Sequence, residues 1–206
     1  MSPGSSAKET PTPHAPVEVR IREALERISA AHGAFLQELA TGAELSALQA
    51  QVLMILLTRP LVAPTTTALA RECRVRTSTM SDAIAALAQK GLVTTERARH
   101  DMRIHTHRLT PDGLRKARKL RSQYARFDSA LSVLSLSERE SLLRLLLSTI
   151  GALWHGGIIT VDRSCATCRF HRDSPGSPAG FCELLGETLT PLSLRTECPE
   201  HQAGEP

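Results

Sequence analysis

The last part of the chain holds four cysteines whose spacing suits a metal centre. They form a Cys-x2-Cys pair, a single cysteine after thirteen intervening residues and another after fifteen more: Cys165, Cys168, Cys182 and Cys198. A Cys-x2-Cys pair brings two thiolates to one metal ion or cluster, and two further cysteines complete four ligands. Residues 173–180 between them are loop sequence without core-forming side chains. The tail therefore needs a bound metal or cluster to stay folded. The sequence therefore predicts a loop-rich four-cysteine tail over residues 161–206.

Two kinds of centre fit these ligands. Four thiolates bind an iron–sulfur cluster, and they also bind zinc, in which case His171 or His201 could replace one of them. The cysteines with their neighbours Arg169-Phe170, Gly180-Phe181 and Pro199 resemble the ligand layout of high-potential-type iron–sulfur proteins and related small cluster-binding subunits. We expect an iron–sulfur cluster, with zinc as the alternative. A cluster would let the protein sense redox state, oxygen or iron, whereas zinc would be structural.

Basic residues concentrate in the middle of the chain. The 206 residues carry a formal net charge of +4, whereas residues 71–121 hold thirteen Lys and Arg against five Asp and Glu, a local charge of +8. Such a concentration is typical of a segment that binds a polyanion, although a solvated Arg-rich helix face would produce it too. Double-stranded DNA is therefore the expected partner of this segment.

Residues 43–110 show the element order of a winged helix-turn-helix. Ser46 and Gln49 have the spacing of a capping box before an apolar helix. A short helix over 65–73, a turn and a third helix over 77–90 follow, with Thr77 as the expected cap of the third. The side chains expected to meet base edges and phosphates in the major groove stand at its start: Arg76, Thr77, Ser78, Thr79, Ser81 and Asp82.

A hairpin of two strands, over 92–97 and 104–109, is predicted to follow, with a polar tip between them. An arginine at such a tip can enter the narrow minor groove. The wing residues expected to contact DNA are Arg97, Arg99, Asp101 and Arg103. Asp101 would hold Arg103 through a charge-assisted pair; an exposed ion pair without a DNA role is the alternative. The three histidines on or beside the wing are expected to be solvent-exposed: His100, His105 and His107.

Four segments of this region carry a resemblance to a known family: Thr77–Asp82, Leu87–Val93, Asp101–Arg103 and Leu109–Gly113. In this order and spacing they resemble the MarR family of bacterial regulators, over roughly residues 17–155. The resemblance implies a homodimer formed by the first and last helices, here 17–42 and 111–158. It also implies a pseudo-palindromic operator, typically bound to repress. The wing departs from the family pattern, because Arg97-Ala-Arg99 stands where an additional acidic residue is often found.

The remaining elements complete a fold that is mainly α with a small β-wing hairpin. Residues 1–16, rich in Pro, Ser and Thr, predict a disordered leader. Apolar spacing predicts an amphipathic helix over 17–39, a long basic helix from 111 to about 134, and a leucine-rich helix opened by a Ser137–Glu140 capping box. The resemblance implies that these three helices, within 17–42 and 111–158, form the dimerisation region.

No stretch is long and apolar enough for a membrane span, so we expect a cytoplasmic protein, in a compartment where disulfides are disfavoured. No phosphate-binding glycine loop and no nucleophile–base set outside the tail indicates an enzyme. We therefore expect a regulator, with a small-molecule effector possible and a cluster-bearing redox enzyme as the less favoured alternative. Cys73 is expected to be a buried small hydrophobic residue, with a thiol sensor as the alternative.

Overall fold

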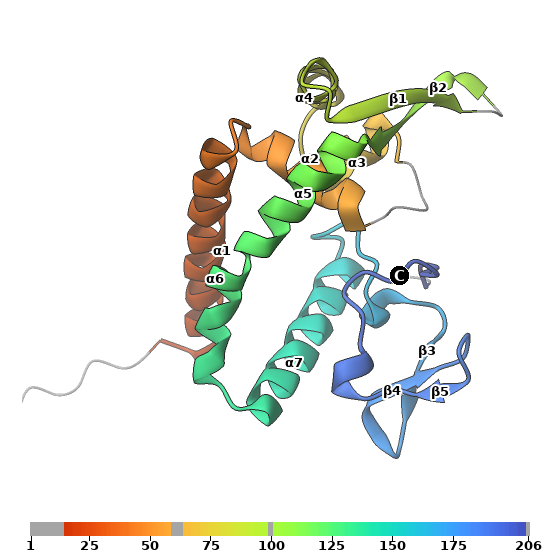
Figure 1. Cartoon of the computed structure of the whole chain (residues 1–206). Helices are drawn as coiled ribbons and strands as arrows, with labels where there is room; N and C mark the ends of the chain where they lie inside the picture. Colours follow the sequence, from red (N-terminus) through yellow and green to blue (C-terminus); the bar gives the residue numbers. More distant parts are fainter. Residues whose placement is uncertain (1–14, 59–63, 99–100, 205–206) are drawn as a thin grey trace, which may run out of the picture.

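The computed structural model describes residues 15–58, 64–98 and 101–204, and at Ala98 and residues 101–103 it describes the backbone alone. The described chain is mainly helical with two small antiparallel sheets, as expected for a winged helix-turn-helix with helical extensions. In Figure 1 the helix-turn-helix and its hairpin lie at the top. Helices α1 (Val17–Gly42) and α5 (Pro111–Gln123) run down from them, and α7 (Leu136–His155) returns with the C-terminal tail beside it.

The winged helix-turn-helix follows the predicted order. Its elements are α2 (Ala47–Thr58), α3 (Thr66–Glu72), α4 (Thr77–Gln89), β1 (Val93–Ala98) and β2 (Asp101–Leu109). The predicted capping box is confirmed: the Ser46 N–H donates to Gln49 Oε1 at 3.2 Å, and the Gln49 N–H donates to Ser46 Oγ at 3.1 Å. At the start of α3, Thr65 Oγ1 accepts from the Ala68 N–H at 3.1 Å.

The hydrophobic core is aliphatic and is centred on this domain, with buried residues of α1 and α5 added to it. Its largest fully buried apolar side chains come from three helices: Val52, Leu53, Leu69, Met80 and Leu87. Each stabilises the fold by about 1.5–3 kcal/mol relative to an exposed position. Because α4 contributes its apolar face to this core, its polar face is turned to solvent.

The hairpin is fixed to the helices at its base. β1 pairs antiparallel with β2, from Val93 opposite Leu109 to Arg97 opposite His105. The Thr110 N–H donates to the Leu92 carbonyl at 3.1 Å, and Gly113 lies so close that a Cβ there would overlap the Leu92 carbonyl oxygen. Glycine is therefore required where α5 begins.

The basic helix predicted from 111 to about 134 is broken into three pieces. They are α5 (Pro111–Gln123), α6 (Ala125–Asp128) and the 3₁₀ segment η1 (Ser129–Val133). The Tyr124 N–H bonds to the Arg121 carbonyl, three residues back, which tightens the helix at this point. The hydroxyls of Ser129 and Ser132 then bond to carbonyls three residues before them, which favours 3₁₀ geometry.

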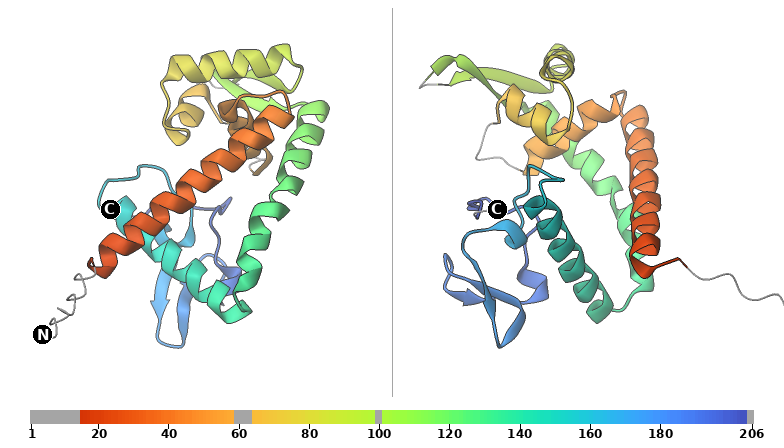
Figure 2. Two further views of the ribbon diagram at one scale, coloured as in Figure 1. Left: turned by 90° about the vertical axis from the view of Figure 1, so that its left-hand side faces the viewer. Right: turned by 180° about the vertical axis from the view of Figure 1, so that it is seen from behind.

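The long helix α1 (Val17–Gly42) packs against this broken helix near its own C-terminal half. Phe35 meets Tyr124 edge to face with ring centroids 5.3 Å apart, and Glu38 pairs with Arg126 at 2.8 Å. Its N-terminal half projects from the body, as Figure 2 shows. In the described chain no single helix combines the length and apolarity of a membrane span; α1 and α2 pass that test only together, as a pair bent by 93°.

Helix α7 (Leu136–His155) begins two residues earlier than predicted. Its capping box is Ser135 with Glu138, not Ser137 with Glu140, because Ser135 has the extended backbone of a cap (φ −60°, ψ 165°) and accepts the Glu138 N–H. Gly156 follows the helix as expected.

The tail is more regular than the loop-rich segment predicted. It contains η2 (Cys165–Thr167), β3 (His171–Ser174), β4 (Ser177–Cys182), β5 (Glu187–Thr188) and η3 (Pro191–Ser193). The three strands form one antiparallel sheet in the order β3-β4-β5. Gly180, at φ +82°, lies against the His171 ring and the Arg172 carbonyl, where a Cβ would clash. Glycine at position 180 lets β3 and β4 approach closely here, which the composition of this segment did not predict.

Candidate DNA-reading face and cysteine site

The start of α4 forms an exposed polar face at the upper edge of the molecule in Figure 1. The six residues predicted to contact DNA all lie there and are all exposed: Arg76, Thr77, Ser78, Thr79, Ser81 and Asp82. The predicted cap is wrong, because Arg76 is the N-cap and Thr77 is already helical, with no side-chain capping bond. A helix start without a side-chain cap leaves backbone N–H groups that can bind a phosphate.

The wing adds a second basic element beside α4. Arg97 is exposed on β1, and Glu96 pairs with Arg108 across the hairpin at 3.7 Å. Arg99 and His100 lie outside the described residues. The backbones of Asp101 and Arg103 belong to β2, but their side chains lie outside what is described, so their pairing stays a prediction.

His107 holds the wing against α3. Its side chain is only 2% exposed, so the prediction of solvent exposure is wrong for His107, while His105 is exposed as expected. One ring nitrogen lies 2.8 Å from Thr66 Oγ1 and the other 3.1 Å from Thr95 Oγ1. Burial, and then the nearby His105, lower the pKa of His107, so the ring is neutral at ordinary pH. The only sequence signal for this role is its inward position in the strand alternation.

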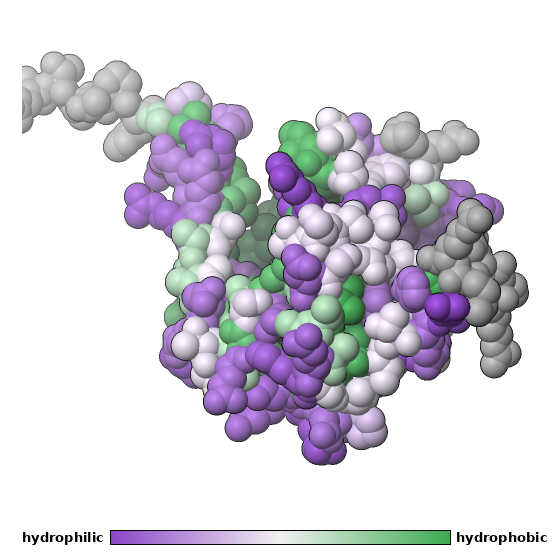
Figure 3. Space-filling model, turned by 90° about the horizontal axis from the view of Figure 1, so that it is seen from above, coloured by the Kyte–Doolittle hydropathy of each residue, from purple (hydrophilic) through white to green (hydrophobic). Residues whose placement is uncertain are grey.

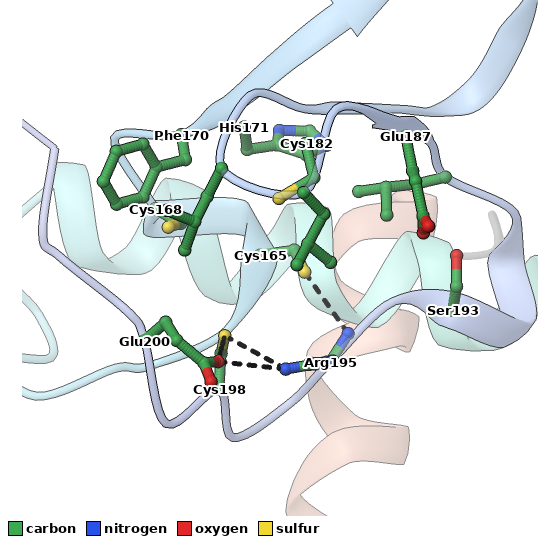
Figure 4. A pocket seen from close by; sticks show the side chains of 13 residues that line it. Cys165, Cys168, Phe170, His171, Cys182, Glu187, Ser193, Arg195, Cys198 and Glu200 are labelled. Atoms are coloured by element: carbon green, nitrogen blue, oxygen red, sulfur yellow. Dashed lines mark hydrogen bonds and ion pairs between the residues drawn. The ribbon is translucent and has the colours of Figure 1, made fainter.

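The tail brings all four predicted ligands to one cavity. Figure 4 shows the sulfur atoms of Cys165, Cys168, Cys182 and Cys198 facing a common space. The cavity has a volume of about 110 Å³, and its wall also includes Phe170, His171 and three leucines, Leu184, Leu185 and Leu189. The four cysteines are free of disulfides. Cysteines spread over more than thirty residues of chain thus form a single site.

A polar network beneath the cavity shapes the Cys-x2-Cys turn. The Asp162 carboxylate accepts from Ser164 Oγ at 2.6 Å, from Thr167 Oγ1 at 2.9 Å and from the Ser164 N–H at 3.2 Å. Ser164 and Thr167 are buried. His201 Nε2 lies 3.0 Å from the same Thr167 hydroxyl. These bonds fix the 3₁₀ turn that begins at Cys165.

The two histidines considered as ligands have other partners. His171 lines the cavity, but its Nε2 lies 2.9 Å from the Ala179 carbonyl, to which it donates. His201 belongs to the network beneath the cavity, and burial lowers its pKa. The geometry thus favours four cysteine ligands over a set that includes histidine.

Arg195, which the sequence analysis did not single out, contacts two of the four sulfurs. Its backbone N–H donates to Cys165 Sγ at 3.3 Å, and its Nη1 donates to Cys198 Sγ at 3.7 Å and to Glu200 Oε2 at 3.1 Å. Burial raises the pKa of the Cys165 thiol, the Arg195 N–H opposes this, and the other three cysteines raise it further. Donors of this kind stabilise thiolates and tune the metal they hold.

The chemistry of the four cysteine donors fits a metal centre. Among the described residues, no three His, Cys, Asp or Glu side chains approach closely enough, as they stand, to hold one ion. The four thiols line the wall of a cavity of about 110 Å³ together with nine other residues. Four thiolates can hold an iron–sulfur cluster or, with Zn–S bonds of about 2.3 Å, a zinc ion, and either centre requires the sulfurs to move closer together.

Cys73 lies apart from this site. It is the C-cap of α3 and is half-buried against the hydrophobic core of the winged helix domain. This placement agrees with a packing role for its side chain.

The comparisons with known proteins concern the winged helix region. A family model described as the MarR family matches residues 43–104. No curated protein matches the sequence. The structure is similar to the S. aureus MepR–DNA complex, at 20% identity and a TM-score of 0.55, over 64% of this chain and 96% of that chain.

Two further solved structures are similar at the same level. PcaV from Streptomyces coelicolor, in complex with its natural ligand, is 23% identical, with a TM-score of 0.53 over 68% of this chain and 99% of that chain. BldR from Sulfolobus solfataricus is 21% identical, with a TM-score of 0.53 over 64% of this chain and 95% of that chain. These likenesses show the fold, which is the winged helix-turn-helix of MarR-type regulators.

Proposed function

We propose that this chain is a MarR-type transcription regulator that binds double-stranded DNA through α4 and the wing. The observation that carries the proposal is the exposed polar start of α4 beside the basic wing, in a segment that matches the MarR family model. The solved MepR–DNA complex, similar in fold, supports DNA as the ligand. On this proposal α4 lies in the major groove, and Arg97 and the wing tip reach the adjacent minor groove.

The proposed regulator acts as a homodimer. The projecting half of α1 exposes a stripe of apolar side chains at helical spacing: Val17, Ile21, Leu25 and Ile28. Helix α7 exposes another, which includes Leu142, Leu145 and Leu146. Figure 3 shows hydrophobic surface beside the projecting arm of α1. Contiguous apolar surface of this kind marks an interface, and a second copy supplies the same stripes by symmetry. The α4 helix and wing of each copy would then bind one half of a pseudo-palindromic operator. The bound dimer would repress transcription.

The cysteine site is proposed to hold an iron–sulfur cluster, with zinc as the alternative. The four thiols around one cavity and the Arg195 N–H donor to Cys165 support a metal centre, and the spacing of the cysteines with their neighbours favours the cluster. When bound, a cluster supplies a charge and a stability that depend on redox state, oxygen and iron. With zinc the site would be structural, and a small molecule would supply the signal; the solved PcaV structure holds such a ligand.

DNA binding is tested by selection from a pool of randomised duplexes, followed by fluorescence anisotropy with the enriched duplex. We expect a shared inverted repeat among the selected sequences. Affinity should fall steeply between 50 and 200 mM salt, because phosphate contacts release counterions. Failure to enrich any sequence, with binding insensitive to salt, would refute the proposal.

The nature of the metal is tested on protein purified without oxygen. Iron and sulfide in comparable amounts, with broad visible absorbance, would establish the cluster. One zinc per chain in a colourless protein would establish the alternative. Absence of iron, sulfide and zinc from the purified protein would refute a metal centre.

A further inference from the structure

An ion pair joins the tail to the helix-turn-helix at Arg163, two residues before Cys165. Its Nη1 lies 3.5 Å from Glu72 Oε2 and 4.0 Å from Glu197 Oε2. Glu72 is the last residue of α3, and Glu197 directly precedes Cys198. One guanidinium nitrogen thus lies between a carboxylate of the DNA-binding domain and a carboxylate next to a cysteine of the cavity.

Nη1 of Arg163 lies within ion-pair distance of both carboxylates but is hydrogen-bonded to neither. Nη1 of Arg163 is buried, and among the described residues no atom accepts a hydrogen bond from it. The Glu72 side chain is 18% exposed, so the pair is partly withdrawn from water. A buried cationic N–H without an acceptor costs free energy, and a small shift toward either carboxylate would relieve that cost.

The backbone of Arg163 is hydrogen-bonded to the cysteine site. The Cys198 N–H donates to the Arg163 carbonyl at 3.0 Å, and the Cys165 N–H donates to the Arg195 carbonyl at 3.0 Å. Arg163 and Glu197 face each other as a parallel bridge. Cys165 and Cys198 therefore lie on the two paired backbone segments that hold Arg163. If a metal draws their sulfurs together, these segments move and Arg163 moves with them.

At the other end of the contact, Glu72 lies close in sequence to the start of α4. Glu72 is followed by Cys73, the C-cap of α3, by Arg74 at φ +54°, and by Arg76, the N-cap of α4. Only this short turn separates Glu72 from the residues proposed to read DNA. A change in its position is passed directly to the start of α4.

We propose that Arg163 couples the cysteine site to the DNA-reading helix, by dividing its charge between Glu72 on α3 and Glu197 beside Cys198. This inference rests on the proposed function, because it assumes that the cysteines hold a metal and that α4 reads DNA. Filling or emptying the site shifts Arg163 from one carboxylate to the other and so changes how firmly the turn before α4 is held. This coupling needs only that Arg163 can pair with either carboxylate. It needs no rearrangement of the hydrophobic core.

The first test is hydrogen–deuterium exchange of the full chain, with its metal as purified without oxygen and after removal of the metal by a chelator. In the wild type we expect exchange over residues 66–82 to differ between the two states. Arg163→Gln should abolish that difference while the metal stays bound, and Glu72→Gln should do the same from the other side of the contact. Arg172→Gln is the matched control, since it removes an ion pair with Glu183 inside the tail, and it should keep the difference.

The second test measures affinity for the selected duplex in both states. The wild type should show a change of about fivefold or more, the usual lower range for allosteric coupling, and Arg163→Gln should reduce it below about twofold. The inference is overturned if the wild type shows no exchange difference, if Arg163→Gln keeps the full difference, or if the chain holds no metal. If no duplex is selected, the proposed function fails, while the exchange experiment still decides whether Arg163 couples the two parts.

Discussion

Replacement of His107 by leucine tests how the wing is held in place. The ring lies between Thr66 Oγ1 and Thr95 Oγ1 and is almost fully buried. Leucine fills similar space but bonds to neither hydroxyl. Thr95 is exposed, so water replaces its lost partner, whereas Thr66 is half-buried. The expected loss of stability is therefore close to that of one hydrogen bond, about 1–2 kcal/mol, or a fall in Tm of about 2–8 °C for a chain of this size.

The same variant changes the dependence of stability on pH. The pKa of His107 in the fold is lowered, chiefly by burial, so the unfolded chain binds a proton before the folded chain does. The wild type should lose stability as the pH falls below about 6.5, the unperturbed value for histidine. His107→Leu removes this contribution. The difference in free energy of unfolding between wild type and variant should therefore become smaller as the pH falls.

Urea unfolding at pH 8 and pH 5.5, at one fixed protein concentration, provides the measurement. His105→Leu is the matched control, because His105 is exposed two residues away, and its midpoint at pH 8 should stay near that of the wild type. Equal midpoints for His107→Leu and wild type at pH 8, or a gap that does not narrow at pH 5.5, would refute the role assigned to His107.

Three further changes probe the other surfaces. Arg76→Ala should weaken binding to the selected duplex and reduce the salt slope by about one, as expected for a lost phosphate contact; an unchanged slope in the anisotropy titration would remove Arg76 from the interface. Cys182→Ser should lose the metal in elemental analysis, whereas Cys73→Ser, outside the cavity, should keep it; equal metal contents would contradict a four-cysteine site. Ile21→Asp should shift sedimentation toward the monomer, because it places a charge in the exposed stripe of α1, and an unaffected dimer would exclude that stripe from the interface.

The order of elements in the winged helix could be predicted because local signals determine it. The Ser46–Gln49 box and the apolar spacing of α4 act over three or four residues, and the structure confirms both. The Ser135 box was misplaced by two residues because two serines offer the same spacing to a glutamate. The 3₁₀ segment over 129–133 was missed because serine hydroxyls there bond to nearby carbonyls, a competition that apolar spacing does not reveal.

The cysteine set could also be predicted, since a Cys-x2-Cys pair is a local pattern, and all four residues line one cavity. The residues around it could not. Arg195, Arg163 and His107 make contacts with parts of the chain that are distant in sequence. Nothing in the local sequence distinguishes the two arginines from other basic residues, and only the strand alternation marks His107. Tertiary contacts gave them their roles.

The most direct test of the central claim is hydroxyl-radical footprinting on the selected duplex. A homodimer that reads DNA through α4 and the wing should protect two half-sites related by a two-fold axis, about one helical turn apart on one face of the DNA. Arg97→Ala should weaken protection at the outer minor-groove positions. A single protected site, or protection that does not follow sequence, would contradict the account.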